Sequence, residues 1–510
     1  MSTLTPLAPA MSWLERSLAL RPETRLFIDG EFRPAHDGAT FDTLSPRDGR
    51  LIAAVSSAGA VDVDIAVRAA ARAFESGVWS RANRRDRQKV LLRLADLMLE
   101  NLEELALLEA LDSGHPIGDA LRVDVPNAAR TVRWYAEAID KVYDEVAPTP
   151  RNALALVTRE ALGVVGAVVP WNYPLIITAW KIAPALATGN SVVLKPAELT
   201  SLSALKLAEL AAEAGLPAGV LNVVSGVGEV AGQALGRHPL VDKITFTGSP
   251  AVGRGFLRYA GESNGKQVAL ELGGKSPQVV LADVEDVAEC ASAVAWGIFY
   301  NAGQTCHGGS RLIVDERVHD ALVDQVLRVG RGLVLGDPLD EATQIGAIAS
   351  ATQLDRVLAY TDVAEAEGAT VHGGRRVRPD GLTDGYYVEP TVFDYVDNTG
   401  RIGQEEIFGP ALSVTTVRGA AEAVAVANES AFGLAASVWT GSVTTAHTVA
   451  RELRAGTVWV NTFDVADVIT PFGGFKNSGS GRDRSLHAFD AYTALKTTWI
   501  NLGDSPLTAD

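Results

Sequence analysis

Cysteine is almost absent from this chain, and its scarcity bears on whether disulfides form and on the compartment in which the protein is found. The 510 residues include two cysteines, Cys290 and Cys306. Two cysteines cannot build a disulfide framework, so we expect two free thiols in a reducing compartment, with a single bridge between them as the alternative. The N-terminus has no basic stretch leading into an apolar core and a small-residue cleavage site. We therefore expect no secretory signal and a cytoplasmic protein.

Positive charge and uninterrupted apolar runs are also scarce. The chain has 45 Lys and Arg against 62 Asp and Glu, a net charge of −17. Such an acidic surface repels nucleic acid phosphates and anionic lipid headgroups, so we expect neither as a partner. An uncharged stretch at 161–180 contains Pro170 and Pro174. It predicts a buried strand, a loop and a helix start in place of a membrane span.

The apolar content, by contrast, suffices for a large core. Hydrophobic residues make up 47% of the chain, and its length corresponds to two or three domains. Four strands are expected, at 164–169, 191–194, 220–224 and 244–246. A helix between the second and third strands is capped at Thr200 or Ser201 and ends before Gly215. This βαβ order predicts a mostly parallel sheet covered by helices, and a second α/β set is expected from 277 to about 459.

Three other segments lie outside the two α/β sets. Residues 1–25 are expected to form a loosely held extension, and the apolar periodicity at 83–111 predicts one long amphipathic helix. The segment 494–502 is strand-like and belongs to neither α/β set. It either pairs across a subunit boundary or frays.

Two residues have the surroundings of catalytic groups. Cys306 lies in NAGQTCHGGS, where small neighbours leave room for a substrate beside a thiol. Glu271 lies in LELGGKSP between apolar residues, where desolvation raises the pKa of a carboxyl and suits it to act as a general base. The alternatives are a small core cysteine and a glutamate bonded to a turn.

Two kinds of segment suggest a nucleotide cofactor. The glycines of 226–232 follow a predicted strand and open a helix, although their spacing departs from the usual dinucleotide fingerprint, and 246–253 repeats the arrangement. Lys195 and Glu198 follow the end of another strand. A carboxylate there accepts both ribose hydroxyls and disfavours the 2′-phosphate of NADP.

Seven segments together resemble one family. PWNYP, LKPAE, FTGS, LELGGKSP, GQTC, EEIFGP and PFGGFKNSG occur in the order typical of NAD(P)-dependent aldehyde dehydrogenases, and the similarity covers nearly the whole chain from about Leu26. RTVRWYAEAIDKVYDEV and GSGRDRSLHAFDAYTALKTTWINL are most similar to the subfamily acting on γ-(γ-glutamylamino)butyraldehyde and related ω-aminoaldehydes. The resemblance implies a role in polyamine catabolism.

The resemblance implies an α/β fold in three parts. A Rossmann-like NAD domain is expected at 26–144 and 161–272, and an α/β catalytic domain at 273–480. A small oligomerisation element with the tail is expected at 145–160 and 481–510. A homodimer or homotetramer is implied.

The same resemblance implies the mechanism. Cys306 attacks the aldehyde to form a thiohemiacetal and then a thioester, while the Asn172 amide and the Cys306 main-chain N–H hold the oxyanion. Glu271 activates the water that hydrolyses the thioester, and relatives that transfer the acyl group to coenzyme A lack this glutamate. Lys195 joins the catalytic set, no metal is expected, and NAD is the expected cofactor with NADP as the alternative.

The resemblance also assigns the two binding regions. The residues expected to contact the cofactor are Val169, Pro170, Trp171, Lys195, Glu198, Gly228, Phe246, Thr247, Gly248, Ser249, Gly253, Leu272, Glu405 and Phe408. Those expected to line the aldehyde pocket are Asn127, Tyr173, Trp180, Tyr300, Thr305, His307, Asp464, Asp467 and Phe472. Asp464 and Asp467 are candidate anchors for a substrate ammonium or parts of a solvated loop, and the side chain of His307 is expected to point away from Cys306.

Two alternatives to an aminoaldehyde dehydrogenase stay open. One is a broad-specificity enzyme for aliphatic or aromatic aldehydes. The other is a non-catalytic NAD-binding protein that kept the fold. The argument against this alternative is that the chain has all three of Cys306, Glu271 and Asn172.

Overall fold

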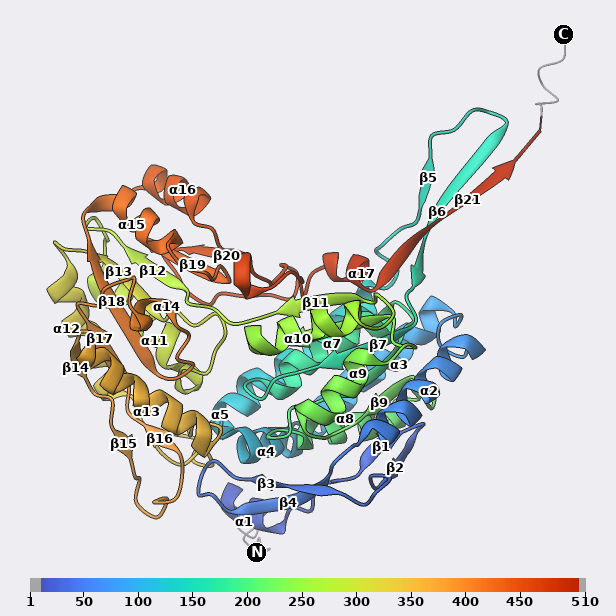
Figure 1. Cartoon of the computed structure of the whole chain (residues 1–510), viewed down its shortest axis with the longest axis horizontal. Coiled ribbons are helices and arrows are strands. Elements are labelled where there is room, and N and C mark those ends of the chain that lie inside the picture. Colours follow the sequence, from blue (N-terminus) through green and yellow to red (C-terminus); the bar gives the residue numbers. More distant parts are fainter. Residues whose placement is uncertain (1–10, 504–510) are drawn as a thin grey trace, which may run out of the picture.

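A first sheet of seven strands organises the N-terminal half of the chain (Figure 1). The computed structural model describes residues 11–503. The strand order is β11-β10-β7-β8-β9-β1-β2, with β7 to β11 parallel and β1 and β2 antiparallel at one edge. The strands are β1 (Leu26–Ile28), β2 (Glu31–Arg33), β7 (Val164–Val168), β8 (Ser191–Lys195), β9 (Leu221–Val223), β10 (Lys243–Thr247) and β11 (Gln267–Glu271). The four strands predicted from β-branched runs, and their parallel order, are confirmed.

Helices cover this sheet and bury its apolar faces. They include α2 (Ala60–Ser76), α6 (Val125–Ala138), α7 (Pro174–Ala187), α8 (Leu202–Glu213), α9 (Gln233–Arg237) and α10 (Pro250–Gly261). The helix α8 begins after Ser201 and is followed by Gly215 with φ +92°, which confirms the predicted start and stop. The stretch 161–180 forms β7, a loop and the start of α7, as predicted. Among residues 11–503, no helix is long and apolar enough to span a membrane.

The predicted single helix at 83–111 is wrong, because the chain forms two. They are α3 (Arg84–Glu100) and α4 (Leu102–Ser113). Asn101 leaves helical geometry at φ −106° and ψ 24°, and its side-chain amide donates to the main-chain oxygen of Leu97 at 2.9 Å. Asn101 thus caps the end of α3, which apolar periodicity alone does not reveal.

The expectation of a loose extension at 1–25 is corrected for part of its length. Residues 13–19 form the helix α1 (Trp13–Ala19), which begins with a capping box between Ser12 and Glu15. Arg16 pairs with Glu103 of α4 at 2.8 Å. Residues 1–10 lie outside the described part of the chain.

A second seven-stranded sheet forms the other half of the body. Its order is β14-β17-β18-β13-β12-β19-β20. The strands are β12 (Pro277–Val280), β13 (Arg311–Asp315), β14 (Thr370–His372), β17 (Thr391–Asp394), β18 (Ala411–Val417), β19 (Ala435–Trp439) and β20 (Thr457–Val460). The helices are α11 (Val287–Phe299), α12 (His319–Gly332), α13 (Ala351–Ala366), α14 (Arg401–Gln404), α15 (Gly419–Asn428) and α16 (Val443–Glu452). This is the predicted second α/β set.

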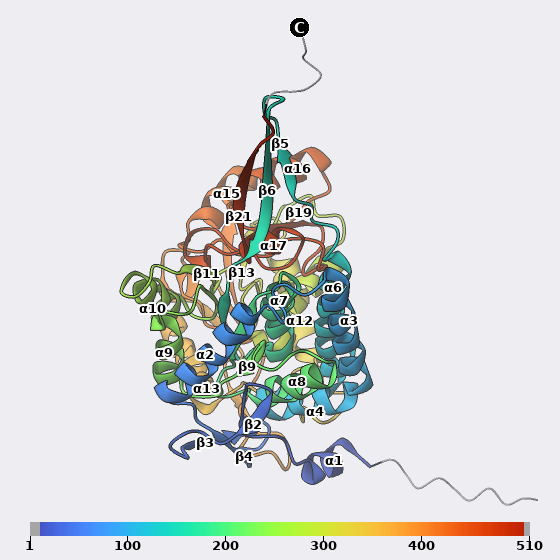
Figure 2. The same cartoon turned by 90° about the vertical axis from the view of Figure 1, so that its right-hand side faces the viewer.

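A third sheet projects from the body as an arm (Figures 1 and 2). It contains β5 (Glu145–Ala147), β6 (Ala153–Ala161) and β21 (Thr493–Asn501), and β21 pairs antiparallel with β6 along all nine of its residues. The C-terminal strand and its separation from both large sheets are thereby confirmed, and the alternative of a frayed end is wrong, because β21 pairs with β6 of the same chain. Pairing across a subunit boundary stays a prediction. The remaining strands and α-helices are β3 (Thr40–Leu44), β4 (Leu51–Ser56), α5 (Ile117–Asp119), β15 (Arg376–Val377), β16 (Tyr387–Val388) and α17 (His487–Ala491).

Candidate active site

Cys306 lies in a tight loop between the two large sheets. After α11 the chain makes a 3₁₀ turn in which Asn301, Ala302 and Gly303 all have positive φ. A side chain on Gly303 would collide with the main-chain oxygen of Gly409, so this position accepts only glycine. The loop leaves Cys306 partly exposed and lining two cavities, whereas Cys290 is buried in α11. Both thiols are free, as expected.

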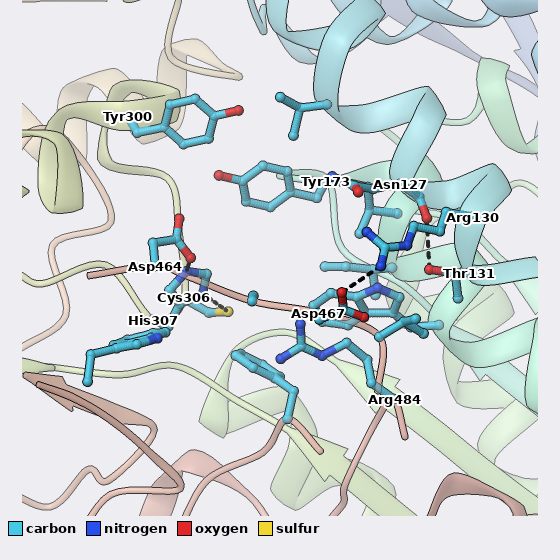
Figure 3. A pocket seen from close by; sticks show the side chains of 18 residues that line it. Asn127, Arg130, Thr131, Tyr173, Tyr300, Cys306, His307, Asp464, Asp467 and Arg484 are labelled. Atoms are coloured by element: carbon cyan, nitrogen blue, oxygen red, sulfur yellow. Dashed lines mark hydrogen bonds and ion pairs between the residues drawn. The ribbon is translucent and has the colours of Figure 1, made fainter. Parts of the chain in front are cut away.

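The first cavity has a volume of about 230 Å³ and is enclosed by aromatic rings and charged side chains (Figure 3). All the predicted pocket residues line it except Thr305, whose hydroxyl bonds the Tyr173 hydroxyl at 2.7 Å. Its lining also includes Val123, Arg130, Thr131, Ile176, Ile177, Trp459, Ala466, Val468 and Arg484, which the sequence did not single out.

The second cavity, of about 180 Å³, opens at the carboxyl ends of β7, β10 and β11. Ligands of doubly wound sheets bind at such strand ends. Of the predicted cofactor residues, the lining contains Pro170, Trp171, Thr247, Gly248, Ser249, Leu272 and Phe408, together with Asn172 and Cys306. Gly273, Gln353, Arg356 and Glu406 complete it.

Of the two adjacent glutamates in EEIFGP, the one that lines the second cavity is Glu406 and not Glu405, which the sequence singled out. Glu406 lines the second cavity and accepts a hydrogen bond from the main chain of Gly274 at 2.8 Å. Glu405 instead accepts from the Tyr360 hydroxyl at 2.8 Å and pairs with Arg401 at 3.0 Å. Adjacent residues in an extended segment point to opposite sides, so in EEIFGP the second glutamate faces the cavity.

The other predicted cofactor residues lie around or after the ends of β7, β8, β9 and β10. Lys195 is buried, and its ammonium contacts the carboxylate of Glu198 at 3.2 Å, while desolvation lowers its pKa. The Glu198 side chain is 44% exposed and therefore open to a ligand. A Cβ on Gly228 would meet nothing within 4 Å, whereas one on Gly253 would lie 2.7 Å from Leu272. Gly253 thus serves close packing of helix on strand, and Val169 and Phe246 are buried in the core.

The side-chain amide of Asn172 is fixed against the Cys306 loop. It donates to the main-chain oxygen of Gln304 at 2.8 Å, and the side-chain amide of Asn301 donates to the main-chain oxygen of Asn172 at 3.0 Å. An amide group carries two hydrogens, so one remains for another acceptor. Asn172 lines the second cavity together with Cys306.

Glu271 is buried with no hydrogen-bond partner for either carboxylate oxygen among the described residues. Desolvation raises its pKa well above the ordinary value, and the nearby Asp483 carboxylate adds to the rise while Lys181 opposes it. Lys181 and Asp483 form a buried ion pair at 2.6 Å. No local sequence pattern indicates this pair, because the two residues are 302 positions apart.

The side chain of His307 was expected to point away from Cys306, but it turns toward the thiol. Its Nδ1 lies 3.9 Å from the Cys306 sulfur, and its Nε2 lies 2.7 Å from the Asp464 carboxylate. Desolvation opposes the charge of the imidazole, but Asp464 outweighs it and raises the pKa of His307 to about 10. Asp464 has φ +59°, which aims it back at the ring.

The two acids predicted as ammonium anchors are already paired within the protein. Asp464 holds His307, and Asp467 accepts from Arg130 at 2.5 Å (Figure 3). The Asp467 pKa is lowered, chiefly by a hydrogen bond from the main chain of Ile469. Both carboxylates line the cavity, but each has its positive partner in place.

Comparison with known proteins gives one consistent family. The model of the aldehyde dehydrogenase family matches residues 32–498. The chain is 48% identical to the NADP/NAD-dependent aldehyde dehydrogenase PuuC of Escherichia coli K12, over 96% of this chain and 98% of PuuC. It is 51% identical to the aminoacetaldehyde dehydrogenase of Pseudomonas aeruginosa, over 94% and 95%. The structure of gamma-glutamyl-gamma-aminobutyraldehyde dehydrogenase from Burkholderia cenocepacia J2315 is similar with a TM-score of 0.94 and 53% identity, covering 97% of this chain and 100% of that one.

Proposed function

This chain belongs to the aldehyde dehydrogenase family, and on that premise we propose that it oxidises an aldehyde to the carboxylic acid, with NAD as hydride acceptor and Cys306 as nucleophile. The observation that carries the proposal is that Cys306 lines both cavities. An aldehyde entering from the first cavity would meet the thiol, and the second cavity would present a hydride acceptor to the same carbon.

The residues around the second cavity fit a dinucleotide. The Thr247 hydroxyl is buried without a hydrogen-bond partner in the described part of the chain, and Gly228 has open space where a side chain would stand. Lys195 and Glu198 would hold the adenosine ribose, and Glu406 would contact the nicotinamide half. NAD, when bound, supplies the hydride acceptor. The Glu198 carboxylate disfavours a 2′-phosphate, which supports NAD over NADP.

The first half of the reaction belongs to Cys306 and Asn172. The Cys306 thiolate attacks the aldehyde carbon, and the carbonyl oxygen becomes an oxyanion. The free hydrogen of the Asn172 amide and the Cys306 main-chain N–H donate to this oxygen. Because Gln304 already fixes the amide, little reorganisation is needed as charge develops. Loss of hydride from the adduct leaves a thioester on Cys306.

The second half belongs to Glu271. Its carboxylate takes a proton from a water molecule, the resulting hydroxide attacks the thioester, and the thiolate leaves with release of the acid. A raised pKa makes this carboxyl a stronger base than a surface glutamate. The buried Lys181–Asp483 pair lies within electrostatic range of Glu271 and sets its charge environment.

We assign the substrate to ω-aminoaldehydes and their γ-glutamylated derivatives. The support is the identity of about half of all residues with relatives named for aminoacetaldehyde and for gamma-glutamyl-gamma-aminobutyraldehyde. The alternative is a broad-specificity aldehyde dehydrogenase, which the aromatic walls of Tyr173, Trp180, Tyr300 and Trp459 favour.

The test is NADH formation by the purified protein over a panel of aldehydes. The panel contains 3-aminopropanal, 4-aminobutanal, 4-guanidinobutanal, the γ-glutamylated aldehyde, and simple alkyl and aryl aldehydes. Higher kcat/KM for the nitrogen-containing aldehydes supports the assignment, and equal values across the panel support the broad-specificity alternative. The Cys306→Ala variant serves as the control. No turnover of any aldehyde by the unsubstituted protein would support the non-catalytic alternative.

We further infer a homodimer or homotetramer assembled through the arm, in the cytoplasm. Leu495 and Trp499 of β21 are 65% and 66% exposed, an unusual exposure for large apolar side chains on a strand. A partner that continues the sheet would cover them. Two free thiols support a reducing compartment. The molar mass in solution, compared with that of Trp499→Glu, tests the assembly.

A further inference from the structure

Arg484 is a buried cation in the first cavity, and it forms no ion pair with any residue from 11 to 503. The residue is 7% exposed, and its Nε has no hydrogen-bond partner among the described residues. The guanidinium carbon lies 5.0 Å from the ring centroid of Trp180 and 5.1 Å from that of Phe472. Figure 3 shows Arg484 beside the space that Cys306 lines. Two aromatic rings therefore hold the guanidinium at the cavity wall.

The neighbouring carboxylates form ion pairs with other cations. Asp464 pairs with His307 at 2.7 Å, Asp467 with Arg130 at 2.5 Å, and Asp483 with Lys181 at 2.6 Å. Desolvation lowers the pKa of Arg484, while these three acids act on it only at longer range. Of the charged side chains that line the cavity within residues 11–503, Arg484 is the one without a paired acid, so the lining carries an excess of positive charge.

A buried charge without a partner is costly, because desolvation is not repaid by an ion pair. An anionic ligand that pairs with the guanidinium would offset this unfavourable free energy. Arg484 also has φ +63°, a strained backbone conformation that points its side chain in a fixed direction. The guanidinium is planar and matches the two oxygens of a carboxylate.

We propose that Arg484 binds a carboxylate at the end of the substrate remote from the aldehyde. The proposal rests on the proposed function and narrows its substrate class to aldehydes with a distal carboxylate, such as the γ-glutamylated aldehyde. It replaces the ammonium anchor expected at Asp464 and Asp467, because both acids are already neutralised. A substrate with an ammonium alone would face the unpaired guanidinium.

The spacing of the rings also favours a long substrate. The Phe472 ring contacts the His307 ring, with centroids 5.6 Å apart, and lies under Arg484. His307 in turn adjoins Cys306. A whole aromatic ring thus separates the surroundings of the nucleophile from the guanidinium. The γ-glutamylated aldehyde extends over roughly 10 Å, as a chain of three residues does, whereas aminoacetaldehyde is far shorter.

The test compares three aldehydes that differ only at the distal end. The first is γ-(γ-glutamylamino)butyraldehyde. The second, N-(4-oxobutyl)-4-aminobutanamide, lacks the carboxylate of the first and keeps its ammonium. The third, 5-oxo-5-(4-oxobutylamino)pentanoate, lacks the ammonium and keeps the carboxylate. For the unsubstituted protein we expect kcat/KM at least about 10-fold higher for both carboxylates than for the amine, since hydrogen bonds to charged groups are the strong ones. Equal values, or a preference for the amine, would overturn the proposal.

Substitution of Arg484 separates binding from folding. Arg484→Met should lower kcat/KM for the two carboxylates about 10- to 100-fold, mainly through KM, and leave the amine within about twofold. Arg484→Lys should recover part of the loss, because it restores the charge without the planar fork. The control is Arg133→Met. Arg133 lies on α6, a helix that contributes other residues to the cavity lining, but its own side chain pairs with Asp96 and does not line the cavity. This substitution should leave kcat/KM for all three aldehydes unchanged.

The outcomes distinguish this proposal from the proposed function. A loss of the same size for all three aldehydes in Arg484→Met means a structural role and overturns the proposal. If Arg484→Met does not fold, the substrate ratios of the unsubstituted protein and of Arg484→Lys still decide it. If the protein oxidises the carboxylates and the amine with equal kcat/KM, the proposed function is supported and the role of Arg484 is contradicted. Absence of turnover with every aldehyde removes both.

Discussion

The main-chain oxygen of Cys306 lies against Gly274, so close that a Cβ at Gly274 would stand 2.5 Å from it. The contact fixes the loop of the proposed nucleophile to the segment that leaves β11, the strand that ends at Glu271. Gly273 is packed in the same way against Glu406. The two glycines of LELGGKSP therefore set the position of the nucleophile relative to the proposed base and to the second cavity.

We predict that Gly274→Ala lowers kcat by about 100-fold, because displacement of a catalytic group by about 1 Å has an effect of this size. Gly261→Ala is the matched control, since a Cβ at Gly261 meets nothing within 4 Å. The measurements are steady-state NADH formation and the melting temperature of each variant. Wild-type activity in Gly274→Ala would show that the contact does not position Cys306.

We predict that the rate of thioester hydrolysis increases as pH rises, and that this increase occurs at pH values above those at which an ordinary glutamate loses its proton. Desolvation raises the pKa of Glu271, so the carboxyl is protonated at low pH and becomes a base as pH rises through that pKa. The same shift means that the folded state holds this proton more tightly than the unfolded chain. The stability that Glu271 contributes is fully present below the unfolded pKa of about 4.5 and is lost as pH rises.

The measurement is the rate of thioester hydrolysis and the free energy of unfolding, each followed from pH 5 to 9. Glu271→Gln should remove the rise in the hydrolysis rate and flatten the fall in stability. A hydrolysis rate that stays constant over this range would contradict the assigned role of the carboxyl.

We predict that His307→Gln slows alkylation of Cys306 by iodoacetamide at neutral pH by about 10-fold. The imidazole lies 3.9 Å from the sulfur and stays positively charged at neutral pH, because Asp464 raises its pKa to about 10. A nearby cation stabilises a thiolate, which is the reactive form. Asp464→Asn should show the same effect to a smaller degree. Unchanged alkylation in both variants would mean that the imidazole only lines the pocket.

We predict that Glu198→Ser raises the preference for NADP over NAD by at least about 10-fold. The Glu198 carboxylate is partly exposed beside Lys195, where it would repel a 2′-phosphate. The measurement is the ratio of kcat/KM for the two cofactors with a single aldehyde. A ratio that does not move would place the adenosine ribose elsewhere.

Local patterns predicted much of the fold. The β-branched runs located the central strands, and the cap at Ser201 with Gly215 located α8, because these signals act within a few residues. The break at Asn101 escaped notice, since the apolar periodicity continues across it and only a side-chain hydrogen bond ends α3.

The candidate site was predictable in composition but not in its pairings. Motifs identified Cys306, Glu271 and Asn172, whereas the Lys181–Asp483 pair and the isolation of Arg484 depend on which distant side chains meet after folding. The sequence singled out Glu405 where Glu406 lines the second cavity, because a motif does not say which of two adjacent glutamates faces the cavity. His307 was misjudged because Asp464, 157 positions away, draws its ring toward the thiol.

The central claim is that Cys306 forms a thioester that Glu271 hydrolyses, and rapid mixing of Glu271→Gln with aldehyde and NAD tests it most directly. Hydride transfer does not require Glu271, so we predict a burst of one NADH per active site followed by turnover at least about 100-fold slower than wild type. Cys306→Ala, run in parallel, should give no burst. Full steady-state turnover by Glu271→Gln without a burst would contradict the account.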